Sequence, residues 1–261
     1  MTRKINLNAD MGEGFGAYDI GNDDGLMQII KSANIACGFH AGDPDVMHRN
    51  VMAAKVRGVS IGAHPGFNDL WGFGRRKIDM SLSALEHAIT YQIGALQAIA
   101  AYSDLKVTHL KAHGALANMA AVDKDMALAI ARAIKVVDPD IIYVALAGSQ
   151  MEAAADKLGL RLAREGFADR QYDDDGNLAS RKLDGAVFKD REVALKQVLR
   201  MVEHGEILAR SGKIIQCRID TICVHGDEPT SLAVARHVRE GLEQAGIDVV
   251  PLTEMDLDSE N

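Results

Sequence analysis

The chain has 261 residues, of which 48% are hydrophobic and 25% charged, with a formal net charge of −8 and three cysteines. This composition supports one mid-sized domain with a large core. The acidic balance and the lack of a Lys/Arg run argue against nucleic acid as a partner. No apolar run approaches the roughly 20 residues that cross a membrane. The cysteines have no CxxC spacing and no signal-peptide core is visible, so we expect neither a zinc ribbon nor disulfides, and a cytoplasmic location.

Short apolar segments alternate with helical patterns along the whole chain. The predicted strands are Ile5–Asp10, Ala33–Cys37, Val59–Ala63, Val107–His113, Ile141–Leu146, Leu160–Glu165, Asp220–Val224 and Ile247–Pro251. The predicted helices are Gly21–Ser32, Pro44–Arg57, Ser81–Ala101, a run from Ala115 to Met119, Lys124–Val137, Gln150–Lys157, Asp190–His204 and Glu228–Ala245. Such alternation, with no low-complexity linker, predicts a parallel sheet that is either closed or doubly wound.

Polar side chains stand at the end of nearly every predicted strand. Alternation along a strand puts His109, Lys111 and His113 on one face of the fourth. The polar residues at or just beyond other strand ends are Asn8, Asp10, Glu13, His40, Asp43, His64, Glu165, His225 and Asp227. A barrel gathers all its strand ends around one mouth, whereas an open sheet gathers its site near one switch point. We therefore predict a distorted, TIM-like (β/α) barrel of seven or eight strands over residues 1–253, followed by an acidic C-terminal tail at 254–261.

Two loops are unusual in composition. Residues 12–24 are rich in glycine without forming a GxGxxG or Walker motif, so a flexible turn and a backbone-lined anion pocket both stay open. Residues 64–77 carry the only tryptophan, Trp71, together with Phe73, Arg75 and Arg76. This second loop is typical of a lid or a partner surface, unless its aromatic residues simply cover the barrel edge.

The polar strand ends indicate acid/base and electrostatic chemistry. Histidines can shuttle protons or bind metal. The aspartates can act as a general base or orient an imidazole, and Lys111 can neutralise a carboxylate or an oxyanion. No serine or cysteine has the context of a nucleophile. This set of groups suits attack of water on a carbonyl or amide, with or without a metal, and it does not suit hydride transfer because no dinucleotide motif is present.

Several motifs together resemble the LamB/YcsF family, and the resemblance covers nearly the whole chain. They are Leu7–Gly16, Ser32–Pro44, Gly62–Gly66 with Gly72–Arg76, Lys111–Leu116, Glu165–Arg170 and Val224–Asp227. Ala112 stands where proline is expected and Ala117 where tyrosine is usual. Neither departure removes a histidine, lysine or carboxylate of these motifs.

The resemblance implies a distorted β/α barrel akin to the polysaccharide-deacetylase and glycoside-hydrolase barrels. It also implies the role of the A subunit of bacterial 5-oxoprolinase, which opens 5-oxo-L-proline to L-glutamate with ATP and needs B and C partner subunits. Magnesium would enter as the counter-ion of ATP. The position of ATP stays open, and the groups that could contribute to it are Lys111, Arg75, Arg76 or those of a partner subunit.

We expect catalytic roles for four residues at the ends of the first, third and fourth predicted strands. Asp10 or His64 is the candidate base, and Lys111 with His113 would stabilise an anion. The predicted substrate-binding residues are Asn8, Glu13, His40, Asp43, Arg75, Glu165, His225 and Asp227. We expect no metal, because the Lys111 cation near the histidines would oppose a divalent ion.

Two other functions stay open. One is a metal-dependent, polysaccharide-deacetylase-like hydrolase, with Asp10, His40 and His64 as ligands. The other is a non-catalytic sugar- or lactam-binding subunit.

Overall fold

A computed structural model describes residues 3–226 and 229–257. Its strands are β1 (Arg3–Met11), β2 (Ser32–Ala36), β3 (Ser60–His64), β4 (Val107–Lys111), β5 (Ile142–Leu146), β6 (Leu162–Phe167), β7 (Glu206–Leu208), β8 (Ile214–Gln216), β9 (Thr221–Cys223) and β10 (Ile247–Val249). Its α-helices are α1 (Asp23–Leu26), α2 (Pro44–Arg57), α3 (Leu82–Ala101), α4 (Gly114–Ala120), α5 (Lys124–Val137), α6 (Gln150–Leu158), α7 (Arg191–His204) and α8 (Pro229–Gln244). The 3-10 helices are η1 (Leu70–Gly72) and η2 (Leu252–Glu254).

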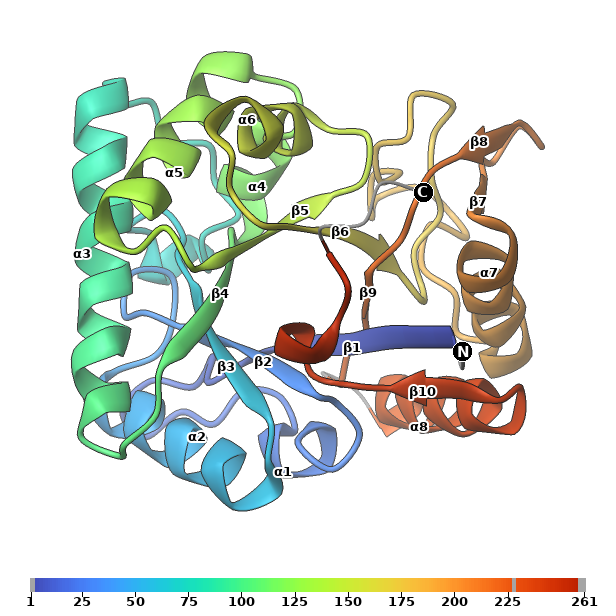
Figure 1. The fold of residues 1–261 in the computed structure, drawn as a ribbon, viewed down its shortest axis with the longest axis horizontal. Helices are drawn as coiled ribbons and strands as arrows, with labels where there is room; N and C mark the ends of the chain where they lie inside the picture. Colours follow the sequence, from blue (N-terminus) through green and yellow to red (C-terminus); the bar gives the residue numbers. More distant parts are fainter. Residues whose placement is uncertain (1–2, 227–228, 258–261) are drawn as a thin grey trace.

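The main sheet closes on itself as a parallel barrel (Figure 1). The order runs from β1 through β2, β3, β4, β5 and β6 to β9, and β9 pairs back onto β1. β10 pairs with the first residues of β1, next to the stretch that pairs with β9. The predicted barrel of seven or eight strands is confirmed: seven strands form the ring, and β10 extends it beside β1.

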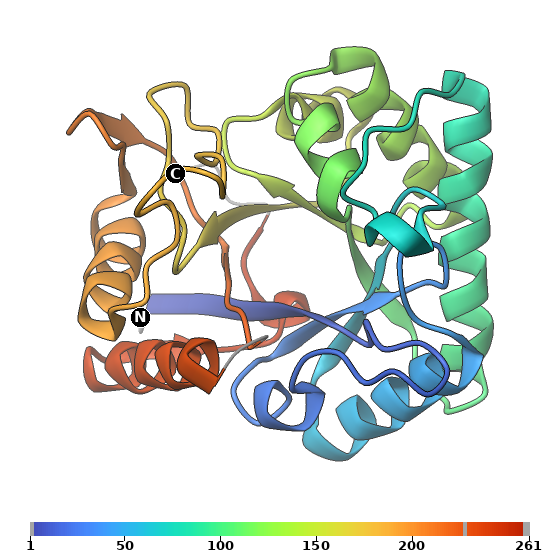
Figure 2. The same ribbon diagram turned by 180° about the vertical axis from the view of Figure 1, so that it is seen from behind.

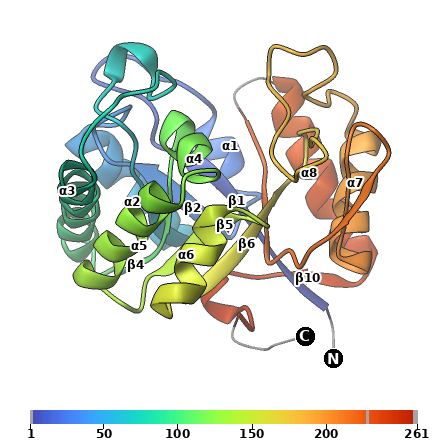
Figure 3. The same ribbon diagram turned by 90° about the horizontal axis from the view of Figure 1, so that it is seen from above.

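The helices lie outside this ring (Figures 1 and 2). Helix α5 packs between α3 and α6, while α7 packs against α8 on the other side of the barrel. Figure 3 looks across the strands, with α3, α5 and α6 on the left and α7 and α8 on the right. Such helices bury one apolar face: Met126, Ile130 and Ile134 of α5 are buried, and Asp123 caps its first turn.

A buried polar network joins β1, β2, β3 and β9. Asn6 donates to Ser32 (2.9 Å), whose hydroxyl lies 2.7 Å from that of Ser60. Thr221 donates to the Asn6 amide oxygen (2.7 Å) and accepts from Asn8 (2.8 Å). All but Ser60 are fully buried. Buried polar groups are costly unless they are paired, so these hydrogen bonds hold the side chains of the network in one arrangement. The charged groups nearer the barrel mouth lie directly above this network.

The C-terminal segment also contributes to the barrel. Leu252 and Leu257 are buried against Ile142, Val144 and Ala163. Leu257, within the segment predicted as an acidic tail, is thus packed against the strands. Residues 258–261 lie outside the described part of the chain.

Several predicted elements have other bounds in the structure, and one pair of strands was not predicted. The helix expected at Gly21–Ser32 is only the short α1, because Lys31 N already donates to Leu7 O (2.9 Å) and the chain enters β2 at Ser32. Strand β6 begins two residues later than predicted. The antiparallel pair β7–β8 was not predicted at all. Within the described ranges, no helix is long and apolar enough to cross a membrane.

Candidate functional site

The carboxyl ends of the strands surround a cavity of about 540 Å³. Asp10 of β1, Lys111 of β4 and Glu165 of β6 line its floor, and His113 and His225 line its walls. These residues come from strands far apart in the sequence. The predicted gathering of polar strand ends at one mouth is thus present.

Lys111 is held between two carboxylates at the bottom of this cavity. Its Nζ lies 2.8 Å from Glu165 Oε1 and 3.0 Å from Asp10 Oδ1. It also donates to Cys223 Sγ (3.1 Å) and Asn8 Oδ1 (3.4 Å). Burial opposes its charge, but the carboxylates, Asp10 foremost, raise the pKa of Lys111 well above its usual value. The side chain is therefore a fixed cation.

The two carboxylates around this cation have opposite properties. Burial would raise the pKa of Asp10, but His64 and Lys111 together hold it well below its usual value. Burial raises the pKa of Glu165, and Lys111 only partly offsets that effect. Asp10 is therefore ionised near neutral pH, and Glu165 is the more readily protonated of the pair. Two carboxylates with divergent proton affinities are a common basis for acid/base chemistry.

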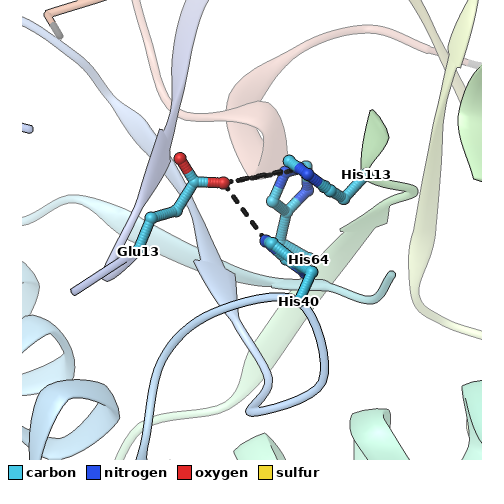
Figure 4. Close-up of side chains that lie close together, drawn as sticks. All are labelled: Glu13, His40, His64 and His113. Carbon is cyan, nitrogen blue, oxygen red and sulfur yellow. Dashed lines mark hydrogen bonds and ion pairs between the residues drawn. The ribbon is translucent and has the colours of Figure 1, made fainter. Parts of the chain in front are cut away.

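Beside Asp10, one carboxylate and three imidazoles converge (Figure 4). Glu13 Oε1 lies 3.1 Å from His40 Nε2, 3.3 Å from His113 Nδ1 and 3.9 Å from His64 Nε2. His64 Nε2 is 3.0 Å from His113 Nδ1. Each of these four donor atoms lies within 4.8 Å of the others. We call this group the Glu13–His cluster.

Backbone carbonyls fix two of the rings. His64 Nδ1 lies 2.8 Å from the carbonyl oxygen of Lys111, and His113 Nε2 lies 2.8 Å from that of Phe73. Burial lowers the pKa of His113 to about 3 and that of His40 well below its usual value. His113 is thus a neutral imidazole, so any part it takes with Lys111 in stabilising an anion is as a hydrogen-bond donor and not as a second cation.

The pKa of the third ring, that of His64, is raised and not lowered. Burial would lower the pKa of His64, but Asp10 raises it above its usual value. The Asp10 carboxylate lies 3.3 Å from His64 Nε2. Asp10 therefore links the Glu13–His cluster to Lys111.

The loop after β3 packs against the rings of His40 and His113, and its close approach requires a glycine at position 74. Gly74 has φ = 63°, and a Cβ atom there would lie 2.7 Å from carbons of both His40 and His113. Its carbonyl also accepts from Ala115 N (2.9 Å). The close packing of loop and rings explains why a glycine stands inside an otherwise bulky segment.

A second imidazole–carboxylate pair lies across the cavity. His225 Nδ1 is 2.8 Å from Asp169 Oδ1. Burial would lower the pKa of His225, but Asp169 raises it above its usual value; the pKa of Asp169 is in turn lowered by His225, against the effect of burial. Arg181 Nη2 lies 3.4 Å from His225 Nε2, which places a further positive group at this wall.

Basic residues surround the upper part of the cavity. Arg75, Arg170, Arg181 and Lys182 all line it. Sequence reasoning did not single out Arg181 and Lys182. The signal was available, because they belong to the long connection after β6, at the same carboxyl end as the other site residues.

Most predicted site residues meet at this mouth, with three exceptions. Asp43 caps α2 by accepting from Val46 N (2.9 Å) and also accepts from Gly16 N (2.7 Å), so it lies outside the cavity. Asn8 lies beneath Lys111 in the polar network. Asp227 lies outside the described residues.

The glycine-rich loop is not an anion pocket. Gly12 N donates to Asp23 (3.1 Å) and Gly16 N donates to Asp43 (2.7 Å), so the chain's own carboxylates occupy the amides that such a pocket would need.

The second loop has two parts with different surroundings. Phe73 lies edge-on to His40 and His113 and covers the barrel edge, whereas Trp71 is 97% exposed. The alternative that both aromatic residues only cover the edge is wrong for Trp71.

The chain is similar to proteins of known name over nearly its full length. The model of the LamB/YcsF family matches residues 5–257. The A subunit of 5-oxoprolinase from Rhodopseudomonas palustris (strain BisB5) is 55% identical over 249 residues, which are 95% of this chain and 98% of that protein. That of Gluconobacter oxydans (strain 621H) is 50% identical over 254 residues, 97% and 100% of the two chains.

A solved structure agrees with these sequence comparisons. The lactam utilization protein from Thermus thermophilus superimposes with a TM-score of 0.90 and 44% identity, covering 95% of this chain and 99% of that one. The chain belongs to the LamB/YcsF family.

Proposed function

We propose that this chain is the A subunit of an ATP-dependent 5-oxoprolinase, which opens 5-oxo-L-proline to L-glutamate. The observation that carries the proposal is the likeness to relatives of that name, at 50–55% identity over nearly the whole chain. The cavity supports it, because a cation between two carboxylates suits addition of water to a carbonyl group.

The substrate presents a lactam and a carboxylate, and the cavity offers a group for each. Lys111 is placed to stabilise negative charge on the lactam oxygen. Asp10, which is ionised and faces the cavity, is our candidate to accept a proton from the attacking water. Arg75 and Arg181, higher in the cavity, are candidates to bind the substrate carboxylate.

ATP overcomes the low reactivity of the lactam. Transfer of its terminal phosphoryl group to the lactam oxygen gives ADP and turns that oxygen into a leaving group. One water then adds to the ring carbon and the C–N bond breaks, the nitrogen taking up protons to become the amine of glutamate. A second water completes the release of phosphate. The sum consumes 5-oxoproline, ATP and two waters, and yields glutamate, ADP and phosphate.

We further propose that the B and C subunits complete the enzyme. ATP would bind with magnesium as its counter-ion, near the basic residues Arg75, Arg181 and Lys182 or on a partner subunit. Trp71, exposed on the loop after β3, is our candidate for a partner contact.

The test is reconstitution. The chain is mixed with B and C subunits, 5-oxoproline and Mg-ATP, and glutamate and ADP are measured together. We expect equal amounts of both products from the full mixture, and little turnover when any one of the three chains is omitted. Absence of 5-oxoproline-dependent glutamate from the full mixture contradicts the proposed activity.

The variant Asp10→Asn, which keeps the size of the side chain, tests whether this chain takes part in catalysis. We expect it to assemble with the partner subunits and to bind 5-oxoproline, but to turn over at least about a hundredfold more slowly. Unchanged turnover would favour a subunit that only binds the lactam.

A further inference from the structure

We propose that Glu13, His40, His64 and His113 form a binding site for one divalent transition-metal ion of the zinc type. This inference goes beyond the proposed 5-oxoprolinase activity and does not depend on it. It rests on donor geometry, on the hydrogen-bonding state of two rings and on local charge.

The donor atoms have the spacing of a metal coordination shell. Zinc binds histidine nitrogen and carboxylate oxygen at about 2.0–2.2 Å, so neighbouring donors of a tetrahedral site lie roughly 3.3–3.5 Å apart. In the Glu13–His cluster four such separations are 3.0, 3.1, 3.3 and 3.9 Å. The rings of His40 and His113 are stacked with centroids 3.6 Å apart, so coordination by both requires them to tilt toward the common centre.

Backbone hydrogen bonds determine which nitrogens can act as ligands. A carbonyl oxygen only accepts, so His64 Nδ1 and His113 Nε2, each 2.8 Å from one, carry hydrogen. When both rings are neutral, as metal binding requires, the lone pairs are on His64 Nε2 and His113 Nδ1. These two atoms face each other at 3.0 Å.

Two facing lone pairs at that distance need a positive charge between them, which is either a proton held by His64 or a metal ion that displaces it. The carboxylate of Glu13, another acceptor, lies 3.1 Å from His40 Nε2 and 3.3 Å from His113 Nδ1. One proton can bridge only a single pair of acceptors, whereas a divalent ion can bind all of them. Metal-binding histidines usually donate their other ring nitrogen to a carbonyl or carboxylate, as His64 and His113 do here.

The charge around the cluster also favours a cation. Asp10, Glu13 and Glu165 carry three formal negative charges, and the Lys111 ammonium offsets one of them. Our expectation of no metal rested on the Lys111 cation. In the structure that cation is paired with Asp10 and Glu165 and is not one of the four converging groups.

The types of donor point to the class of metal. Three imidazoles and one carboxylate suit zinc and its neighbours in the first transition row, whereas magnesium prefers oxygen ligands. The magnesium that accompanies ATP is therefore not the expected occupant. Since the four ligands follow or end β1, β2, β3 and β4, the ion would join four consecutive strand ends.

The experiment uses the full chain without partner subunits. The purified protein is stripped of metal with a chelator, dialysed and titrated with Co²⁺ as a visible-absorbing substitute for zinc. We expect one Co²⁺ per chain, with the intense visible bands of a four- or five-coordinate ion, and displacement by Zn²⁺. At a hundredfold excess over its Kd, Zn²⁺ should raise the Tm by roughly 5 °C.

Two variants and one matched control identify the ligands. Glu13→Gln and His113→Gln should each weaken Co²⁺ binding more than about a hundredfold. His225→Gln removes an imidazole from the same cavity that is not in the cluster, and it should leave Co²⁺ affinity unchanged. Circular dichroism and thermal melts establish that each variant is folded.

Two results would overturn the proposal. One is a folded, unmodified chain that binds neither Co²⁺ nor Zn²⁺ stoichiometrically. The other is equally tight Co²⁺ binding by folded Glu13→Gln and His113→Gln chains. These measurements need no ATP, lactam or partner subunit. Metal binding can therefore be absent while 5-oxoprolinase activity is present, and metal binding can be present while that activity is absent.

Discussion

The Lys111 ammonium lies 3.0 Å from Asp10 and 2.8 Å from Glu165, so one buried cation on β4 joins the ends of β1 and β6. This triad has a structural and a chemical consequence. Removing the cation leaves two carboxylates close together in a poorly solvated place. It also removes the positive group nearest to any reacting carbonyl on the cavity floor.

Lys111→Met should therefore damage both turnover and stability. We expect turnover of the reconstituted complex to fall about a hundredfold, equivalent to roughly 3 kcal/mol of transition-state stabilisation. Breaking a buried ion pair commonly costs about 3–5 kcal/mol. Protonation of Glu165 should keep the loss at the low end of that range. Steady-state kinetics and a thermal melt check the two effects.

The double variant Lys111→Met/Glu165→Gln separates these effects. Removing one of the two uncompensated carboxylates should recover a large part of the lost Tm without restoring turnover. If turnover returned together with the Tm, Lys111 would be a structural residue.

Trp71→Ala should weaken assembly and leave the folded chain intact. The indole is 97% exposed, so its loss should change the Tm by less than about 1 °C. A central aromatic contact in an interface is commonly worth about 2 kcal/mol, which corresponds to binding roughly 30-fold weaker. Sedimentation or calorimetry with the partner subunits measures this.

Tyr102→Ala is the matched control for that variant. Tyr102 is 86% exposed, but it follows α3, at the opposite end of the barrel from the cavity. Equal effects of the two substitutions on assembly would argue against a specific contact at Trp71.

The pair His225–Asp169 should make stability depend on pH. The pKa of His225 is raised above about 6.5, so its contribution is fully present below that pH and is lost as the pH rises through the folded value. The pKa of Asp169 is lowered below 3.8, so its contribution is present above that pH and lost in stronger acid. Asp169→Asn should therefore destabilise the chain most between these limits.

Thermal melts at about pH 5.5 and about pH 9 test this window. The Tm difference between the unmodified chain and Asp169→Asn should be on the order of a few degrees at the lower pH and smaller at the higher one. Asp184→Asn, which alters an exposed carboxylate on the same connection, should show no such trend. If the Tm loss caused by Asp169→Asn grew with pH, it would contradict a stabilising ion pair between Asp169 and His225.

Gly62→Ala should destabilise the barrel through a clash. A Cβ atom at this position of β3 would overlap the buried ring of His109. We expect a loss of about 1–3 kcal/mol in the free energy of unfolding. Gly94→Ala, on the exposed face of α3 with open space around it, should instead be neutral or stabilising by about 0.5–1 kcal/mol. Chemical denaturation of both variants measures the difference.

The order of strands and helices was predictable because it depends on local patterns. The apolar runs that became β2, β3 and β5 end at turn residues, and α3 and α5 have periodic apolar faces with a serine or aspartate cap. Short or irregular elements were not predictable in this way. α1 has four residues and β7 and β8 have three residues each, which is too short for a periodic apolar pattern to show.

By itself the sequence determined that His40, His64, Lys111 and His113 would meet, because parallel strands bring their carboxyl ends to one mouth. It could not determine the role of each. His109 shares a strand face with Lys111, yet it is fully buried beside Gly62, and Asp43 follows a strand end, yet it caps a helix.

Only the tertiary structure decided which charges neutralise one another. It paired Lys111 with Asp10 and Glu165, and it turned His64 and His113 toward Glu13 by fixing their other nitrogens on backbone carbonyls. Electrostatic energy depends on separations of a few ångströms and on burial. Neither quantity can be obtained from spacing along the chain, so the charge state and binding capacity of the site emerge only when the barrel closes.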